Sequence, residues 1–208
     1  MIRFSLFAFI ALIAPLSLAA RSAADFFISA PDAIFRLLPQ STRMDMVDYF
    51  NYGSSRASDN YFGGEAKINE LSESYISFDI DRDVTVCINL LPTTKGDTVI
   101  AMVTTLSLPV EDSELSFFSS DWQPISPPPV KIPSYDEWIT PLGKSESAHI
   151  GLFLSFIPVK AEFSRDGHTL TFSNGALSFL GNSADVSPEM LVPEIIFDVE
   201  GARFTRRK

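Results

Sequence analysis

The sequence predicts an α+β fold, in which a mostly antiparallel β-sheet carries a short N-terminal pair of helices on one face. Three observations predict it. Apolar residues recur with helical spacing between residues 31 and 51. From Glu65 onward they alternate with polar residues instead. The turns between the alternating segments are too short for crossover helices, which favours antiparallel pairing.

Residues 1–20 have the pattern of a secretory signal peptide. Arg3 supplies the basic start, residues 4–16 are almost continuously apolar, and small residues follow up to Ala20. The alternative is an uncleaved anchor helix, but the apolar run is shorter than the roughly 20 residues that a bilayer span needs. We therefore expect an exported chain with no transmembrane segment after cleavage. No cysteine stands directly after the predicted cleavage site to carry a lipid anchor.

Two helical pieces are expected after the signal peptide. The first covers residues 31–38 and has a proline in its first turn. The second covers residues 41–53, with Thr42 and Asp45 as a capping box and Gly53 as a left-handed stop. This second helix is amphipathic, and its apolar face comprises Met46, Val47, Tyr49 and Phe50.

An antiparallel meander is predicted over residues 65–108. The run from 98 to 108 is apolar on both sides for part of its length, which is typical of a central strand covered on both faces. The predicted strands lie at residues 75–80, 84–90, 98–108 and 114–118.

The second half of the chain is expected to be a further β-rich part of one domain that spans residues 21–208. A proline-rich connector, residues 126–135, separates the two β sub-halves. One helical turn is predicted over 136–142 and a strand over 150–163. Two hairpins follow, with turns at Asp166-Gly167 and Glu200-Gly201.

The charge balance excludes several partners. The chain has a formal net charge of −10, so it is a poor candidate for binding nucleic acid or anionic membranes. Cys87 is the single cysteine, so no intramolecular disulfide can form. A small buried residue is expected at Cys87 rather than a catalytic thiol.

The sequence has no short catalytic or cofactor signature. It lacks a phosphate loop, a dinucleotide fingerprint and a nucleophile elbow. The two histidines, His149 and His168, do not have metal-ligand spacing, and we expect ordinary surface or rim roles for both. No cofactor and no metal site are predicted.

An acidic triplet, Asp79, Asp81 and Asp83, has the opening spacing of a calcium loop. Val84 and Leu90 occupy the positions where that loop needs glycine and a bidentate glutamate. A polar hairpin end is therefore the simpler interpretation.

Five residues are candidates for a binding site. Asp45 and Asp48 lie three apart on the second helix, although helix capping and the helix dipole explain them without chemistry. Trp122, Tyr135 and Trp138 fall in or near predicted loops. Loop aromatics can form a platform for a sugar or a peptide, or they can cap the ends of a β core. No catalytic residue is assigned.

Several short segments between residues 24 and 125 form a recognisable set. They are Phe26-Phe27, Ala30-Pro31-Asp32, Leu37-Leu38 and residues 43–49, then Leu90-Leu91-Pro92, Thr104-Thr105, Pro109-Val110, Asp112-Ser113 and Trp122. In these segments the chain resembles a family of uncharacterised exported proteins from Bacteroidales-type bacteria, a domain of unknown function. The resemblance implies the periplasm or cell surface of a Gram-negative bacterium. It implies no activity, ligand or catalytic residue.

Export, the acidic composition, the loop aromatics and the lack of a catalytic signature lead to one functional expectation. We expect a non-enzymatic envelope protein that binds a protein or a glycan. The alternative is a hydrolase with dispersed carboxylates that acts on an envelope polymer.

Overall fold

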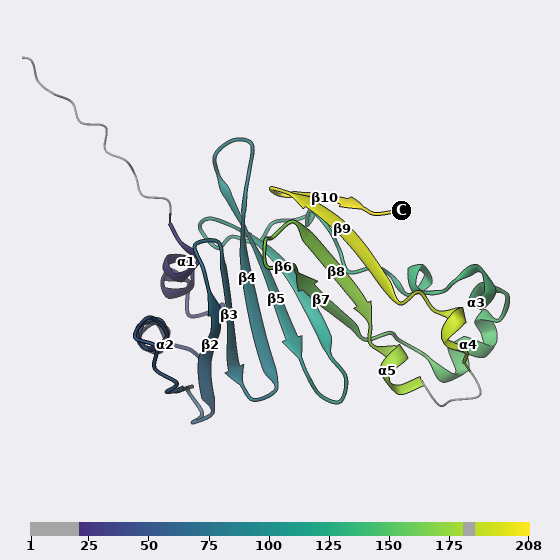
Figure 1. The fold of residues 1–208 in the computed structure, drawn as a ribbon, viewed down its shortest axis with the longest axis horizontal. Helices are drawn as coiled ribbons and strands as arrows, with labels where there is room; N and C mark the ends of the chain where they lie inside the picture. Colours follow the sequence, from purple (N-terminus) through teal and green to yellow (C-terminus); the bar gives the residue numbers. More distant parts are fainter. Residues whose placement is uncertain (1–20, 181–185) are drawn as a thin grey trace, which may run out of the picture.

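The computed structural model describes residues 21–180 and 186–208, apart from the side chains of residues 147–149 and 179. It contains two antiparallel sheets and a small number of helices, which confirms the α+β prediction (Figure 1). The predicted signal peptide, residues 1–20, lies outside the described residues. In the part of the chain that is described, no helix has the length and apolarity needed to cross a membrane.

The first sheet is a six-stranded meander in which each strand pairs with the next along the chain. This arrangement confirms the antiparallel pairing predicted from the short turns, and the register is continuous across β4, β5 and β6. Its strands are β1 (Ser58–Asp59), β2 (Glu65–Leu71), β3 (Tyr75–Asp81), β4 (Val84–Pro92), β5 (Thr98–Leu106) and β6 (Asp112–Ser119).

The second sheet has four strands in the order β10-β9-β8-β7. Its strands are β7 (Val159–Phe163), β8 (Thr169–Asn174), β9 (Glu194–Glu200) and β10 (Arg203–Arg206). Both hairpins predicted for the second half are present, since β7 pairs with β8 and β9 pairs with β10.

The strand predicted over residues 150–163 is wrong in its first half. Residues 147–153 form helix α4 (Ser147–Phe153), and only the last five residues form β7. Ile150 and Leu154, which lie one helical turn apart, are both buried in one small apolar cluster. Burial on that helical face outweighs the β-like composition of the segment.

Helices α1 (Ala23–Ser29) and α2 (Gln40–Asn51) form the N-terminal pair. The helix predicted over residues 31–38 is instead a series of turns, and the first helix lies upstream of it. The capping box is also displaced. It joins Ser22 to Asp25 at the start of α1, whereas Pro39 precedes α2 without a side-chain cap.

The predicted stop at Gly53 is confirmed. Gly53 has a φ of +66°, which is the left-handed region. Its N–H bonds to the carbonyl of Phe50, and the N–H of Ser54 bonds to the carbonyl of Tyr49. These two bonds satisfy carbonyls at the end of α2 in the Schellman pattern.

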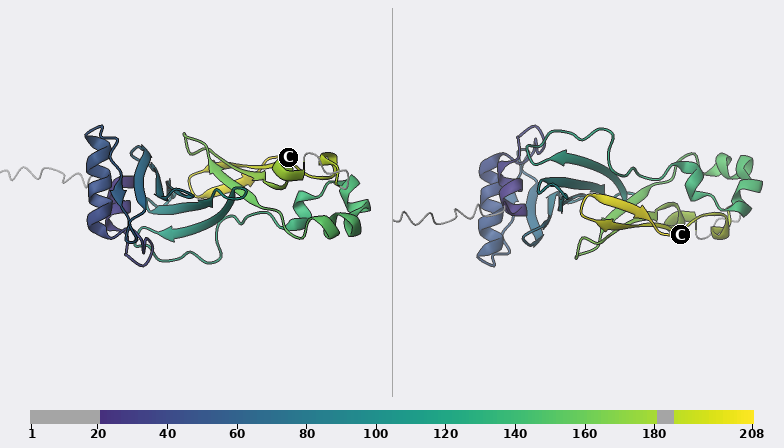
Figure 2. Two further views of the ribbon diagram at one scale, coloured as in Figure 1. Left: turned by 90° about the horizontal axis from the view of Figure 1, so that it is seen from below. Right: turned by 90° about the horizontal axis from the view of Figure 1, so that it is seen from above.

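The helices cover one face of the first sheet (Figure 2). Met46 and Val47 of α2 are buried there, as the amphipathic pattern predicts. Aromatic rings form the centre of this contact: the ring centroids of Phe27 and Phe78 are 4.4 Å apart, and those of Phe35 and Phe78 are 5.5 Å apart. The N-terminal pair is therefore bound to the sheet mainly by apolar burial.

The opposite face of the first sheet packs against the second sheet. Ala101, Val103 and Phe117 of the first sheet share a hydrophobic cluster with residues from all four strands of the second, including Ala161 and Phe172. Two side chains at the start of β6 also bind the outer edge of β7. Asp112 Oδ1 accepts from the N–H of Val159 (2.9 Å), and the Ser113 hydroxyl accepts from the N–H of Ala161 (3.0 Å).

A third cluster lies at the far end of the molecule from α1 and α2 (Figure 2). The proline-rich residues 126–135 run from β6 toward it. That residues 21–208 form one domain stays a prediction, which the cluster shared by the two sheets supports. The short helices of this end are η1 (Tyr135–Trp138), α3 (Pro141–Ser145), α4, α5 (Ala176–Leu180) and η2 (Pro188–Met190).

The β9–β10 turn makes a close contact with the end of β4. Gly201 has a φ of +57°, and a Cβ added there would overlap the carbonyl oxygen of Pro92. Gly201→Ala should therefore lower the free energy of unfolding by about 2–3 kcal/mol, through backbone strain together with the clash. Chemical denaturation measures this change.

Gly96→Ala is the matched control for Gly201→Ala. Gly96 has a φ of +86°, but no atom lies within 4 Å of an added Cβ. Its cost should be strain alone, about 1 kcal/mol. Equal effects of the two variants would contradict a specific contact between Gly201 and Pro92.

Candidate functional site

The face of the first sheet that meets the second sheet changes chemistry across its width. Under the second sheet it presents apolar side chains such as Ala101 and Phe117. On β3 and β4, the same face carries Ser77, Thr85 and Cys87. A groove of about 210 Å³ lies along this boundary, between the polar strands and β7.

The floor of the groove carries hydroxyl and thiol groups. The polar side chains come from β3, β4 and β5, and they are Tyr75, Ser77, Thr85, Cys87 and Thr105. β3 pairs with β4 without interruption from Tyr75 to Asp79, and β4 pairs with β5 along its whole length, so the floor is rigid. The β7 wall contributes Lys160, Glu162 and Phe163.

One chain of hydrogen bonds runs through the centre of the floor. The Tyr75 hydroxyl donates to Cys87 Sγ (3.3 Å), and the Cys87 thiol donates to the Ser77 hydroxyl (3.5 Å). Burial, followed by the contact with Cys87, raises the pKa of Tyr75 above its usual value. Tyr75 therefore stays a neutral phenol at physiological pH. The single cysteine is half-buried among these groups, whereas a buried residue was predicted.

A second chain of bonds extends the polar floor toward the sheet edge. Asp79 Oδ1 accepts hydrogen bonds from the Thr85 hydroxyl (2.8 Å) and from the side-chain amide of Asn69 (2.9 Å). The sequence predicted that Asp79 belongs to a polar hairpin end. In the structure, its carboxylate also orients a neighbouring hydroxyl group and a neighbouring amide group. Fixed donors and acceptors of this kind can recognise a ligand that carries many hydroxyl groups.

Three charges form one side of the groove. Lys160 Nζ lies 3.1 Å from Glu111 Oε1 and 3.6 Å from Glu162 Oε2. Burial acts to lower the pKa of Lys160, but the two carboxylates outweigh it and the pKa is raised. Lys160 is therefore a stable cation and not a candidate general base.

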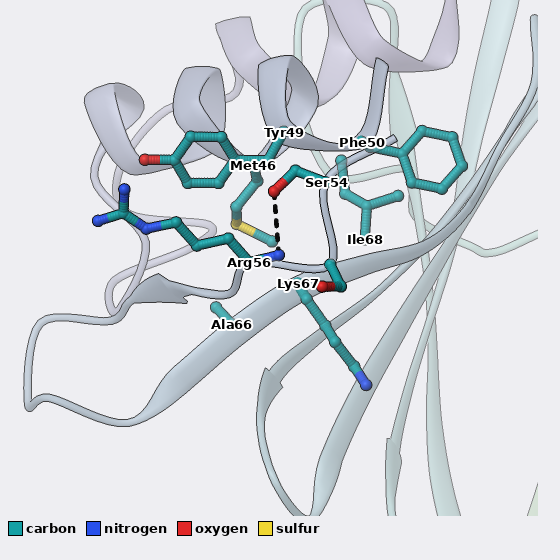
Figure 3. Close-up of a pocket in the computed structure, with 9 residues that line it drawn as sticks. Met46, Tyr49, Phe50, Ser54, Arg56, Ala66, Lys67 and Ile68 are labelled. Carbon is teal, nitrogen blue, oxygen red and sulfur yellow. Dashed lines mark hydrogen bonds between the residues drawn. The ribbon is translucent and has the colours of Figure 1, made fainter. Parts of the chain in front are cut away.

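A smaller hollow of about 60 Å³ lies between α2 and β2 (Figure 3). Met46, Tyr49 and Phe50 line it from the helix, and the Arg56 guanidinium lies 5.2 Å from the centre of the Tyr49 ring. Figure 3 shows the side chains of Arg56 and Lys67 pointing away from each other. Because these two cations do not converge, we regard the hollow as a packing feature between helix and strand.

The structure does not bring the five predicted site residues together. Asp45 and Asp48 are exposed on α2. Trp122 is buried in the cluster beneath the helices, and Trp138 is buried in the cluster between the sheets. Tyr135 and Trp138 alone share a hollow, which has a volume of about 260 Å³. The Tyr135 hydroxyl donates to the carbonyl of Leu154 (2.9 Å), and the Trp138 indole donates to the carbonyl of Pro133 (3.2 Å).

The one histidine side chain that the structure describes does not add a catalytic arrangement. His168 is exposed in the β7–β8 turn, as the sequence predicted, and the side chain of His149 lies outside the described residues. Within the described part of the chain, no cluster of three histidine, cysteine or acidic residues is placed to hold a metal ion.

The sequence did contain a signal for the groove. Alternation along β3 and β4 places Ser77 and Asp79 on one face, and Thr85, Cys87 and Asn89 on the same face of the next strand. The strand predictions rested on the apolar face alone, so this polar row was not identified as a candidate site. What the alternation could not indicate was that a second sheet would form the opposite wall.

A family model described as "Protein of unknown function (DUF3256)" matches residues 15–204. The chain belongs to this family. The resemblance to a domain of unknown function is thus confirmed, and the match extends well beyond the segments on which it rested. No curated protein matches the chain.

One solved structure has the same fold as this chain. It is described as a domain of an uncharacterized protein from Porphyromonas gingivalis, which is a member of the Bacteroidales. The identity is 17%, the TM-score is 0.70, and the alignment covers 88% of this chain and 97% of the other. The likeness establishes a common fold across both sheets, and at this identity it carries no function.

Proposed function

We propose that this protein is an exported envelope-interaction module that binds a glycan in the groove between its two sheets. One observation carries the proposal: the face of the first sheet becomes lined with hydroxyl groups where the second sheet stops covering it. The groove has a volume of about 210 Å³, which is below the roughly 300–1,000 Å³ of pockets for drug-sized ligands. The groove therefore suits a single unit of a polymer.

The location is part of the same proposal. The signal-peptide pattern of residues 1–20 supports export, and the Bacteroidales relative supports the periplasm or cell surface of a Gram-negative bacterium. Because the chain is acidic, it is also better suited to a neutral ligand than to an anionic polymer such as nucleic acid.

The hydrogen bonding of β7, which forms one wall of the groove, favours a glycan over an extended protein segment. β7 is the edge of the second sheet, and a peptide could pair with it only through the N–H and C=O groups on its outer side. Two of these, at Val159 and Ala161, already donate to Asp112 and Ser113. The floor hydroxyls remain as the recognition groups, and they suit hydroxyl-bearing sugars.

No specific observation favours the alternative of a hydrolase. Asp45 and Asp48 project from an exposed surface and do not line the groove. The shifted carboxyl pKa values, those of Asp25, Glu137 and Asp166, are all lowered, chiefly by hydrogen bonds from backbone or serine groups. A general acid requires the opposite shift.

Thr85→Val tests the groove. The change removes one floor hydroxyl while keeping the shape of the side chain. It should weaken binding of a neutral hexose or N-acetylhexosamine oligosaccharide about three- to tenfold, which corresponds to one hydrogen bond. NMR titration of the ¹⁵N-labelled protein measures this, with the amides of β3 and β4 as reporters.

Thr171→Val is the control for this titration, since Thr171 lies on the outer face of β8. Its affinity should equal that of the unmodified protein. A lack of saturable shifts in β3 and β4 with every oligosaccharide would contradict the proposal. So would identical affinities for Thr85→Val and the unmodified protein.

A further inference from the structure

A second cleft, of about 270 Å³, lies on the same face of the first sheet. It is bounded by the end of β4, the β7–β8 turn and the β9–β10 turn. It begins where the groove ends: Asn89, which lines the cleft, pairs in register with Tyr75, which lines the groove. The cleft is a separate site with different chemistry.

Asn89 is the unusual residue of this cleft. Its side chain is 3% exposed, and its amide nitrogen has no hydrogen-bond partner within the described part of the chain. A buried donor without an acceptor destabilises the folded state, because it has lost its hydrogen bonds to water without replacement. Because this nitrogen is itself buried, a ligand oxygen reaches it only when the Asn89 amide turns toward the cleft, so ligand binding and the satisfaction of Asn89 would be coupled.

A cation stands at the rim of the same cleft. Arg165 is 89% exposed, and its contact with Glu70 is a loose 3.8 Å ion pair. An exposed ion pair of this kind contributes little free energy, so Arg165 can exchange Glu70 for a ligand carboxylate. Arginine also suits this exchange because its planar guanidinium can bind a carboxylate through two hydrogen bonds.

The neighbouring acid, Asp166, lines the same cleft and keeps its negative charge, but one of its two carboxylate oxygens is engaged within its own turn. Asp166 Oδ1 accepts from the Ser164 hydroxyl (2.6 Å) and from the N–H of His168 (3.0 Å). The turn is further closed by a hydrogen bond from the N–H of Gly167 to the carbonyl of Ser164 (2.8 Å). These contacts hold the turn in one shape, with Arg165 at its outer corner.

We propose that this cleft binds a carboxylate group, with the Asn89 amide as a buried donor and the Arg165 guanidinium as the charged donor. Acidic sugars and the C-termini of peptides both carry such a group. The proposal stands on the residues of the cleft and does not require that the groove bind a glycan.

The test is an NMR titration of the ¹⁵N-labelled protein with four probes. D-glucuronate and N-acetyl-alanine carry carboxylates, and glucose and N-acetyl-alanine amide are their neutral counterparts. We expect saturable shifts of the Asn89 side-chain amide and of the residue 165–168 amides with one or both carboxylates, and none with the neutral probes. The carboxylate that binds tighter identifies the source of the group.

Two variants and a control make the test decisive. Arg165→Ala, at an exposed position, should weaken carboxylate binding at least fivefold. Asn89→Asp replaces the buried donor with an acceptor and should abolish it. Arg82→Ala removes an exposed arginine from the β3–β4 turn and should leave the affinity unchanged.

Three results would overturn the proposal: no saturable shift at Asn89 with either carboxylate, equal shifts with the neutral probes, or unchanged affinity in Arg165→Ala. Because Arg165 is exposed, its variant remains informative if Asn89→Asp fails to fold. Weaker sugar binding in Thr85→Val, with carboxylate binding retained, would show that groove and cleft act separately.

Discussion

Replacing Arg43 with methionine should lower the free energy of unfolding by about 3–5 kcal/mol, since each buried carbonyl that loses its hydrogen-bond donor costs about 1–3 kcal/mol. Arg43 lies on α2 and is only 1% exposed. Its guanidinium donates to the carbonyls of Leu38 (2.7 Å), Ala30 (2.6 Å) and Ile28 (3.2 Å). Methionine has a similar length but no donor, so these carbonyls would lose their partner.

The three carbonyls explain why a charge is buried at this place. Burial lowers the pKa of Arg43, and nearby Asp32 acts in the opposite direction. Asp32 Oδ1 lies 3.2 Å from an Arg43 guanidinium nitrogen, but the Asp32 side chain is 68% exposed, so solvent screens its contribution. The carbonyls of Ile28 and Ala30 belong to the end of α1 and the turn after it, and that of Leu38 ends the turns before α2. Arg43 thus joins the two helices across an irregular segment.

Urea denaturation measures the effect of Arg43→Met, and two further variants locate its origin. Arg36→Met removes an exposed arginine from the same turns and should change the free energy of unfolding by less than about 0.5 kcal/mol. Asp32→Asn should cost less than about 1 kcal/mol. A loss below about 1 kcal/mol for Arg43→Met would show that the helices are held together without it.

Phe78→Ala should also lower the free energy of unfolding by about 3–5 kcal/mol, because a large fully buried ring would be removed. Phe78 of β3 is 0% exposed, and it contacts both Phe27 of α1 and Phe35 of the turns that follow. Phe35 in turn contacts Trp122, with ring centroids 5.8 Å apart. Removal of Phe78 would leave a cavity beneath the helices that a rigid sheet cannot fill by collapse.

Phe50→Ala is the matched control, since the same side chain is truncated on α2. Phe50 is only partly buried and lines the small hollow between α2 and β2. Its truncation should cost about 1–2 kcal/mol, in proportion to the smaller apolar area removed from water. Thermal or urea denaturation of both variants checks the ranking. A larger loss for Phe50→Ala than for Phe78→Ala would place the centre of the helix–sheet contact elsewhere.

The sequence predicted the first sheet well because its strands pair with their neighbours along the chain. Alternation identified β3, β4, β5 and β6, and short turns left antiparallel pairing as the simplest connection. The N-terminal region was predicted less well. The Ser22–Asp25 capping box marks the start of α1, but a seven-residue helix is too short to stand out by period alone.

The candidate site could be predicted only in part. Its floor is present in the alternation of β3 and β4, where polar residues such as Ser77 and Thr85 share one face. The aromatic candidates Trp122 and Trp138 instead occupy two separate cores, because large rings contribute most to stability when they are buried. Their position near loops could not distinguish a binding platform from a buried anchor.

The sequence by itself determined the local features of this protein: the period of its strands, the stop at Gly53, the hairpin turns and the family to which it belongs. Tertiary structure alone decided the rest. It placed the second sheet over one part of a face of the first, which left the groove and the Asn89 cleft between them. It also directed Arg43 into three distant carbonyls. The physical reason is that these features depend on contacts between residues far apart in the chain, whereas periodicity and turn chemistry report only on neighbours.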